Sequence, residues 1–264
     1  MRRNPLVWFF VLTYAVTWTL WWAASVVPLV VASRELVFLP GTVAPAVVAL
    51  WLTARLEGRA GVNALLGRLF AWQVRVRWYL FAVGFMAAIK GMVAVWQHVF
   101  TRAWPQFEAV PWLLLAGAVV LSTPVQAGEE IGWRGFALPR MAARLGLGRA
   151  GVLLGVIWAG WHLPLFFFAG TDSTGQSFPV YVLGVTAVSV AIAWLYGHTG
   201  GSLLLVMLMH SAINNTPHFV PPVTAPSVWA LSTSFPGWLT TLFLWVAAAY
   251  FLARMPKAPV SRHH

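Results

Sequence analysis

The sequence predicts an all-α fold: a single domain, residues 1–264, that crosses a membrane about eight times. Hydrophobic residues make up 60% of the chain and charged residues only 9%, and the mean hydropathy is +0.76. A soluble domain carries about 25% charged residues, so this composition is typical of a polytopic membrane protein. The apolar stretches lack the alternating pattern of a membrane β-barrel, which leaves helices as the spanning elements.

Eight apolar stretches are long enough for transmembrane helices, since about 20 apolar residues cross the hydrocarbon core. Pro111 and Pro179 stand near helix starts, where a missing N–H costs little. Pro164 predicts a kink or break inside the fifth span. The first stretch is too long and too rich in tryptophan to be a cleavable signal. The predicted spans are residues 6–30, 36–54, 78–99, 110–130, 150–169, 178–197, 201–218 and 228–252.

The basic residues predict the orientation in the membrane. The net charge is +11, but the positive residues lie between apolar spans rather than on one soluble face, which argues against a nucleic-acid-binding protein. Cytoplasmic loops are enriched in Lys and Arg, so the pattern predicts an integral protein of the cytoplasmic membrane, in contact with lipid and with both termini in the cytoplasm. The residues on that side are Arg2, Arg3, Arg55, Arg59, Arg68, Arg75, Arg77, Arg134, Arg140, Arg144, Arg149, Arg254, Lys257 and Arg262, against Arg34 and Arg102 opposite and Lys90 within a span.

Residues 57–77 are too polar to span the membrane, and two interpretations stay open. Leucine and aromatic residues alternate with Arg59, Arg68 and Arg75 in a loosely amphipathic pattern. Such a pattern is typical of a helix that lies at the cytoplasmic interface, with its arginines on anionic head groups. The other interpretation is a positively charged loop.

Polar side chains inside the predicted spans form three groups. An ionisable side chain at membrane depth is costly, so each group is by default a candidate functional site. The chain has only six acidic residues, and two of them stand side by side at positions 129 and 130. The groups are Glu129, Glu130 and Arg134 at the end of the fourth span, Trp158 and His162 in the fifth, and His210 and Asn214 in the seventh.

Helical spacing separates the roles of the two glutamates. Residues four apart share a helix face, so Glu130 and Arg134 are predicted to form a fixed ion pair. Glu129 is turned about 100° from Glu130 on a helix of about 3.6 residues per turn. Glu129 therefore lacks a local cation and is the candidate general base that activates a water molecule.

The remaining polar residues complete a predicted hydrolase. His162 and His210 could be metal ligands, transition-state donors or both, and zinc or another divalent metal is an option, since histidine is a common zinc ligand. The chain has no cysteine, which excludes thiolate ligands and a cysteine nucleophile. Asn214 shares a face with His210, and its amide could donate to a developing oxyanion. His263 and His264 are typical of a tag remnant and have no predicted role.

The three motifs resemble those of the CAAX-protease and bacteriocin-processing family (CPBP, or Abi). The segment GEEIGWRGF is similar to the family's E-E-x-x-x-R motif; Trp158 stands where the family usually has phenylalanine, ahead of His162; and HSAIN at 210–214 matches His-x-x-x-Asn. The motif-bearing core covers about residues 110–218. The resemblance implies an intramembrane protease whose site, formed by Glu129, His162, His210 and Asn214, opens toward the cytoplasm.

The resemblance also implies supporting roles for Glu130 and Arg134, and a substrate that is a membrane-associated or prenylated peptide or protein. Whether the water is activated by a metal or by the glutamate with histidine help stays open. Two other functions are considered. A non-catalytic scaffold or immunity protein would be expected to lose one of the four site residues, and none is missing. A transporter often has pseudo-symmetric halves, and no internal similarity is evident.

Overall fold

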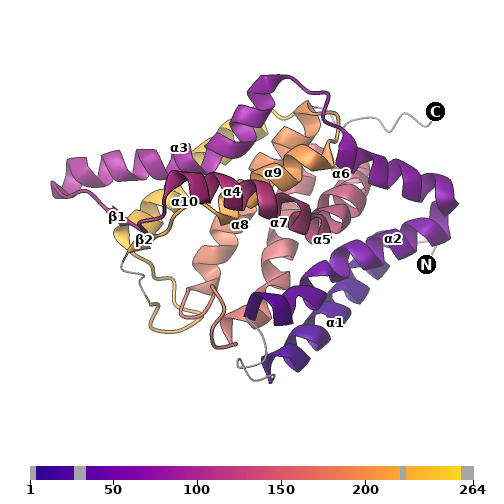
Figure 1. Cartoon of the computed structure of the whole chain (residues 1–264), viewed down its shortest axis with the longest axis horizontal. Coiled ribbons are helices and arrows are strands. Elements are labelled where there is room, and N and C mark those ends of the chain that lie inside the picture. Colours follow the sequence, from indigo (N-terminus) through magenta and orange to yellow (C-terminus); the bar gives the residue numbers. More distant parts are fainter. Residues whose placement is uncertain (1–3, 27–33, 221–223, 257–264) are drawn as a thin grey trace.

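The computed structural model describes residues 4–26, 34–220 and 224–256, and these are mostly helical (Figure 1). The predicted all-α class is confirmed. Within the described residues the only strands are β1 and β2, two residues each, which pair antiparallel. The elements are α1 Pro5–Ser25, α2 Arg34–Gly67, η1 Arg68–Phe70, α3 Val76–Thr101, β1 Gln106–Phe107, α4 Trp112–Ser122, η2 Thr123–Gln126, α5 Ala127–Glu130, η3 Ile131–Ala137, α6 Leu138–Leu145, α7 Leu147–Trp161, η4 Leu163–Phe166, α8 Phe178–His198, α9 Leu203–Asn214, β2 Phe219–Val220 and α10 Phe235–Ala253.

Each predicted span coincides with a helical segment, but the segments differ in length. In the described part of the chain, five helices are long and apolar enough to cross a membrane, namely α1, α2, α3, α8 and α10. The apolar helices α7 and α9 are shorter, with 15 and 12 residues. The predicted span 110–130 is divided among α4, η2 and α5. Eight crossings therefore stay a prediction.

The prolines act as predicted. Pro179 stands in the first turn of α8, and Pro111 directly precedes α4. The helix α7 ends at Trp161, and Pro164 belongs to the short 3₁₀ turn η4 that follows. Proline lacks an N–H and disfavours α-helical geometry in the residue before it. The α-helix α7 therefore ends before Pro164, and a 3₁₀ turn follows His162.

The structure corrects part of the interpretation of residues 57–77. The helix α2 continues through most of this segment to Gly67, with one non-helical residue at Gly58, which has φ +68°. The short turn η1 follows, and its first residue, Arg68, hydrogen-bonds main-chain carbonyl groups of other segments. The protein itself therefore binds the guanidinium group of Arg68, and contact of the segment's arginines with lipid head groups stays a prediction.

The basic ends of several elements lie near one another. Asn4 at the start of α1 lines a cavity of about 270 Å³ together with Arg140 and Arg144 of α6. A Cβ atom placed at Gly148, at the start of α7, would lie 3.6 Å from the side chain of Met255, just after α10. Figure 1 shows β1 and β2 at the opposite end of the molecule from the N-terminus. Of the basic residues that were assigned to the cytoplasm, Arg2, Arg3, Lys257 and Arg262 lie outside the described residues, as do His263 and His264.

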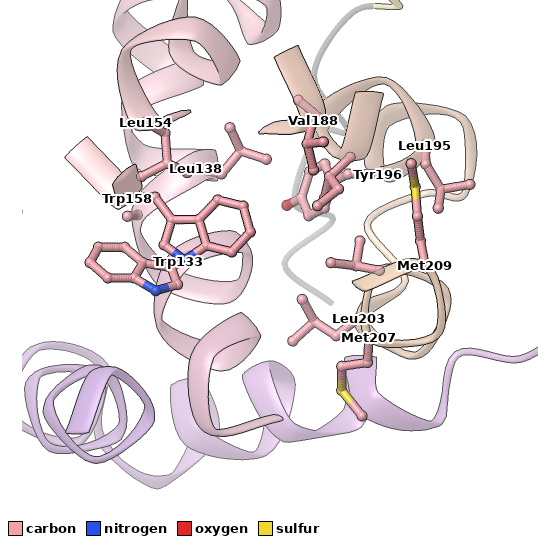
Figure 2. Packing of buried hydrophobic residues seen from close by; sticks show 14 of the residues in the cluster. Trp133, Leu138, Leu154, Trp158, Val188, Leu195, Tyr196, Leu203, Met207 and Met209 are labelled. Carbon is pink, nitrogen blue, oxygen red and sulfur yellow. The ribbon is translucent and has the colours of Figure 1, made fainter. Parts of the chain in front are cut away.

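Helices α7, α8 and α9 share one buried core. Helix α8 packs against α7, α9 and α10, and α2 packs against α5 and η3. Figure 2 shows Leu154 and Trp158 of α7 within the same buried cluster as Leu195 of α8 and Leu203 of α9. The three helical segments that carry the sequence motifs are therefore neighbours in the folded chain.

Candidate active site

The acidic motif lies where α5 meets the π-helical segment η3, and it packs closely against α2. A Cβ atom at Gly132 would lie 2.7 Å from the carbonyl oxygen of Pro45, and a Cβ at Gly128 would also contact α2 closely. Small residues four apart allow two helices to approach in this way. The close contact buries Glu129, which is 7% exposed, and Glu130, which is 0% exposed. π-Helical turns are frequent at functional sites.

The predicted ion pair of the fourth span is present. Glu130 Oε1 accepts a hydrogen bond of 2.8 Å from Nη1 of Arg134, and both side chains are fully buried. The same oxygen lies 2.8 Å from Nδ1 of His210 on α9. The histidine partner was not predicted, because it is 80 residues away in the chain. Glu130 therefore joins the first motif to the third.

Glu129 has a different partner. Its Oε2 accepts a 2.7 Å hydrogen bond from Nε1 of Trp158 on α7. The prediction that the two glutamates face different partners is confirmed. The indole N–H holds one carboxylate oxygen of Glu129, and Oε1 is not engaged in this bond.

The end of α7 explains the position of His162. The last carbonyl groups of a helix lack partners within it. At this end the backbone N–H of His162 bonds the carbonyl of Ala159 rather than that of Trp158. The carbonyl of Trp158 instead lies 2.8 Å from Nδ1 of the His162 ring. The helix end therefore orients the imidazole.

The aromatic ring of Trp158 brings the three motifs together. The guanidinium carbon of Arg134 lies 4.1 Å from the ring centroid, which is a cation–π contact. The imidazoles of His210 and His162 meet the ring edge to face, with centroid distances of 5.2 and 5.6 Å. Trp158 is only 4% exposed, so these contacts form in a buried environment.

Hydrogen bonding sets the tautomers of both histidines. A carbonyl oxygen can only accept, so Nδ1 of His162 carries the proton in its bond to Trp158. The same reasoning applies to Nδ1 of His210, which lies beside the carboxylate oxygen of Glu130 that also accepts from Arg134. When a ring is neutral, its other nitrogen, Nε2, then has the lone pair that a general base or a metal ligand needs.

Asn214 lies apart from this cluster of contacts. Its side chain is exposed, and it lines a cavity of about 310 Å³ beside α4, together with Glu108 and His218. Glu129, His162 and His210 are not among the residues that line this cavity. The next residue, Asn215, donates from Nδ2 to Ser122 Oγ and to the carbonyl of Ser211, each at 2.9 Å. The structure thus groups three of the four predicted residues around Trp158 and places Asn214 one helical turn beyond His210.

Comparison with known proteins identifies the region that carries these residues. Residues 108–216 match the family described as type II CAAX prenyl endopeptidase Rce1-like. The predicted resemblance to CAAX prenyl endopeptidases is confirmed. CAAX prenyl protease 2 of Methanococcus maripaludis is 25% identical over 235 residues, which cover 81% of this chain and 83% of that protein. The matched residues nearly coincide with the core predicted at 110–218.

All the candidate residues fall within the matched residues 108–216. In the described part of the chain they do not form a complete metal site. In the described part of the chain, no three His, Cys, Asp or Glu side chains are grouped so that they could hold a metal ion. A catalytic zinc site usually has about three protein ligands. His162 and His210 could contribute Nε2 atoms, so the set of donors fits zinc only in part.

Arg68 precedes the matched residues 108–216 in the sequence but hydrogen-bonds to residues within them. The sequence motifs did not indicate this role. Its guanidinium group donates to the carbonyl of Gly135 at 3.1 Å and to that of Gly201 at 3.0 Å. It also donates to the hydroxyl of Tyr196 at 2.8 Å. Arg68 therefore connects η3 to the turn between α8 and α9. Arg68 stands beside leucines in the amphipathic segment, which is a signal for partial burial. The spacing does not identify its hydrogen-bond partners.

Proposed function

We propose that this protein is an intramembrane endopeptidase that cleaves a peptide bond in a membrane-associated or prenylated peptide or protein. A water molecule activated by Glu129, with help from histidine, would be the nucleophile. The observation that carries the proposal is the convergence of Glu129, His162 and His210 on one buried tryptophan, Trp158. The similarity to CAAX prenyl endopeptidases supports the same substrate class.

Proton transfer in this proposal begins at Glu129. Trp158 occupies Oε2, so Oε1 accepts a proton from the attacking water. The water oxygen forms a bond to the peptide carbonyl carbon, and a tetrahedral intermediate results. The C–N bond then breaks, and the proton held by Glu129 passes to the leaving nitrogen, which yields a carboxylic acid and an amine and restores the carboxylate of Glu129. A positioned general base contributes about 10²–10⁴-fold to such a reaction.

The histidines and Asn214 have supporting roles in the same step. Nε2 of His162 accepts a hydrogen bond from the water and directs its lone pair toward the carbonyl. His210 belongs to the same helix as Asn214, α9. Residues four apart on a helix have Cβ atoms about 5–6 Å apart, so a substrate that reaches His210 from the cavity at Asn214 could receive the amide N–H on its oxyanion.

Metal assistance is an alternative form of the same proposal. His162 and His210 would hold the ion through Nε2, and zinc would supply Lewis-acid polarisation of the carbonyl and a more acidic water. A third ligand is not grouped with them in the described residues. The steps above are therefore written with the chain's own side chains.

The proposed environment is the cytoplasmic membrane, with both termini and the arginine-rich connections on the cytoplasmic side. The positive-inside pattern supports this orientation, and so does the proximity of Asn4 to Arg140 and Arg144. The partners are then membrane lipid and a peptide or lipidated protein substrate.

The test uses the purified full-length protein in lipid vesicles with a prenylated peptide that ends in a CAAX tetrapeptide. Mass spectrometry of the products compares the wild type with Glu129→Gln. The glutamine oxygen can still accept the indole N–H, so we expect unchanged folding and a loss of turnover of about 100-fold or more. A wild-type protein that leaves this peptide and unprenylated membrane peptides intact would favour a non-catalytic scaffold or immunity protein.

A further inference from the structure

We infer that Trp158 is a positioning residue for the proposed base, and that it acts through its indole N–H rather than through the volume of its ring. The inference rests on the proposed function and adds a specific group to it. The N–H of Trp158 fixes one oxygen of Glu129 and thereby aims the other at the water.

The contacts of Trp158 support a specific role for the N–H. The donor–acceptor distance to Glu129 Oε2 is 2.7 Å, which is typical of a bond to an ionised acceptor. Trp158 is 4% exposed and Glu129 is 7% exposed, so water has little access to compete for the carboxylate. A hydrogen bond in such an environment is electrostatically stronger than one in water.

Trp158 also links the base to its other neighbours. Its carbonyl group orients His162, and its ring contacts Arg134 and His210. A shift of the indole would therefore move the base relative to both histidines. Phenylalanine at this position would keep a ring for Arg134 and His210 but would leave Oε2 of Glu129 without this donor.

Other buried tryptophans provide a comparison within the same chain. In the described residues, the indole nitrogens of Trp133, Trp161, Trp194 and Trp245 are buried and have no hydrogen-bond partner. Those of Trp18 and Trp21 donate to main-chain carbonyl groups. The bond from Trp158 is a distinct feature of the cluster around Glu129.

The first experiment tests the bond independently of activity. The protein is labelled with ¹⁵N-tryptophan in detergent micelles, and the indole signal of Trp158 is assigned by its loss in Trp158→Phe. We expect Glu129→Gln to shift this signal upfield by more than any other indole signal, because a carboxylate acceptor becomes a neutral amide. A Trp158 signal that does not move would overturn the inference, even if the enzyme proves inactive on every peptide tested.

The second experiment tests the consequence for turnover. Trp158→Phe should lower kcat on a prenylated CAAX peptide by about 10- to 100-fold, the scale expected when a catalytic group is misplaced by about 1 Å. KM should change by less than about threefold, since the substrate's binding surface is kept. The matched control is Trp194→Phe, which removes an unpartnered indole N–H in α8 and should leave kcat within about twofold of the wild type.

Two outcomes would overturn the positioning role. In one, Trp158→Phe keeps wild-type kcat although the indole signal has shown the bond. In the other, Trp194→Phe lowers kcat as much as Trp158→Phe, which would make the effect one of ring volume. If Trp158→Phe does not fold, tryptophan is replaced biosynthetically by a benzothienyl analogue, which has the same shape but no N–H, and the fall in kcat must persist.

Discussion

Glu130→Gln should destabilise the protein strongly, because the carboxylate compensates a guanidinium group that water does not reach. Arg134 is 0% exposed, and among the described residues its Nε and Nη2 atoms have no hydrogen-bond partner. After the substitution, the face of Trp158 and the more distant carboxylate of Glu129 are the remaining compensation, and a cation–π contact is worth about 0.5–2 kcal/mol. Removing one partner of a buried ion pair costs about 3–5 kcal/mol.

Thermal unfolding in detergent measures this cost. A loss of 3–5 kcal/mol corresponds to a fall in the apparent Tm of about 6–20 °C for a chain of this size. The matched control is Glu57→Gln, because Glu57 pairs with Arg140 where the side chains are 42% and 24% exposed. An exposed pair of this kind is worth about 0–1 kcal/mol, so the control should unfold close to the wild type.

A double variant separates loss of charge compensation from loss of shape. Glu130→Gln combined with Arg134→Gln removes the isolated charge, so this variant should be more stable than Glu130→Gln alone. The reasoning is refuted if Glu130→Gln unfolds within about 2 °C of the wild type. It is also refuted if Glu57→Gln is equally destabilising, or if the double variant is less stable than the single one.

Three further predictions concern support, orientation and metal. Arg68→Gln should lower the free energy of unfolding by about 1.5–3 kcal/mol, the contribution of a hydrogen bond to a charged donor. The control Arg75→Gln, at an exposed position, should leave it unchanged, and urea unfolding measures both. A cysteine introduced at Arg59 or Arg144 should react with an impermeant thiol reagent only after cells are permeabilised, and labelling of intact cells would show that the orientation is wrong. If Glu129 activates the water without a metal, incubation with a chelator should leave peptide cleavage within about twofold; a large loss that zinc restores would show that the reaction is metal-assisted.

Helical periodicity was sufficient to predict local features of a continuous helical stretch. The pair Glu130–Arg134 follows from a spacing of four, and the break after His162 follows from Pro164. Each of these contacts depends on the local backbone geometry alone. The membrane composition likewise predicts helices, because only helices or closed barrels satisfy the backbone in lipid.

Contacts between distant segments were beyond this reasoning. The bond from Trp158 to Glu129 joins residues 29 apart, and the bond from His210 to Glu130 joins residues 80 apart. Both depend on how closely α5 and η3 approach their neighbours, and the glycines at 128 and 132 help to set this distance on the α2 side. A Gly-x-x-x-Gly pattern around the acidic pair was the available signal for close packing, but it does not identify the partner helix.

Asn214 shows the limit of spacing within a single helix. It stands four positions after His210, a spacing that predicts a shared helix face. The helix α9 ends at Asn214, and the side chain there is exposed. The next residue, Asn215, instead donates hydrogen bonds to Ser122 of α4 and to the carbonyl of Ser211, and both bonds are partly buried. At a helix end, a shared helix face therefore does not ensure a shared environment.

The bond between Glu130 and His210 changes how the two glutamates should be compared. If Glu130 paired with Arg134 alone, loss of activity in a Glu130 variant would be a consequence of lost stability. Glu130 also holds the proton-bearing nitrogen of His210, so its replacement alters the tautomer and orientation of that ring as well. Loss of turnover at Glu130 therefore does not by itself identify a base. Oε2 of Glu130 also lacks a hydrogen-bond partner in the described residues, but Glu130 is 0% exposed and its Oε1 is held by the cation Arg134. Glu129 is 7% exposed and its partner is the neutral indole of Trp158. This difference is the physical reason for proposing Glu129 as the base.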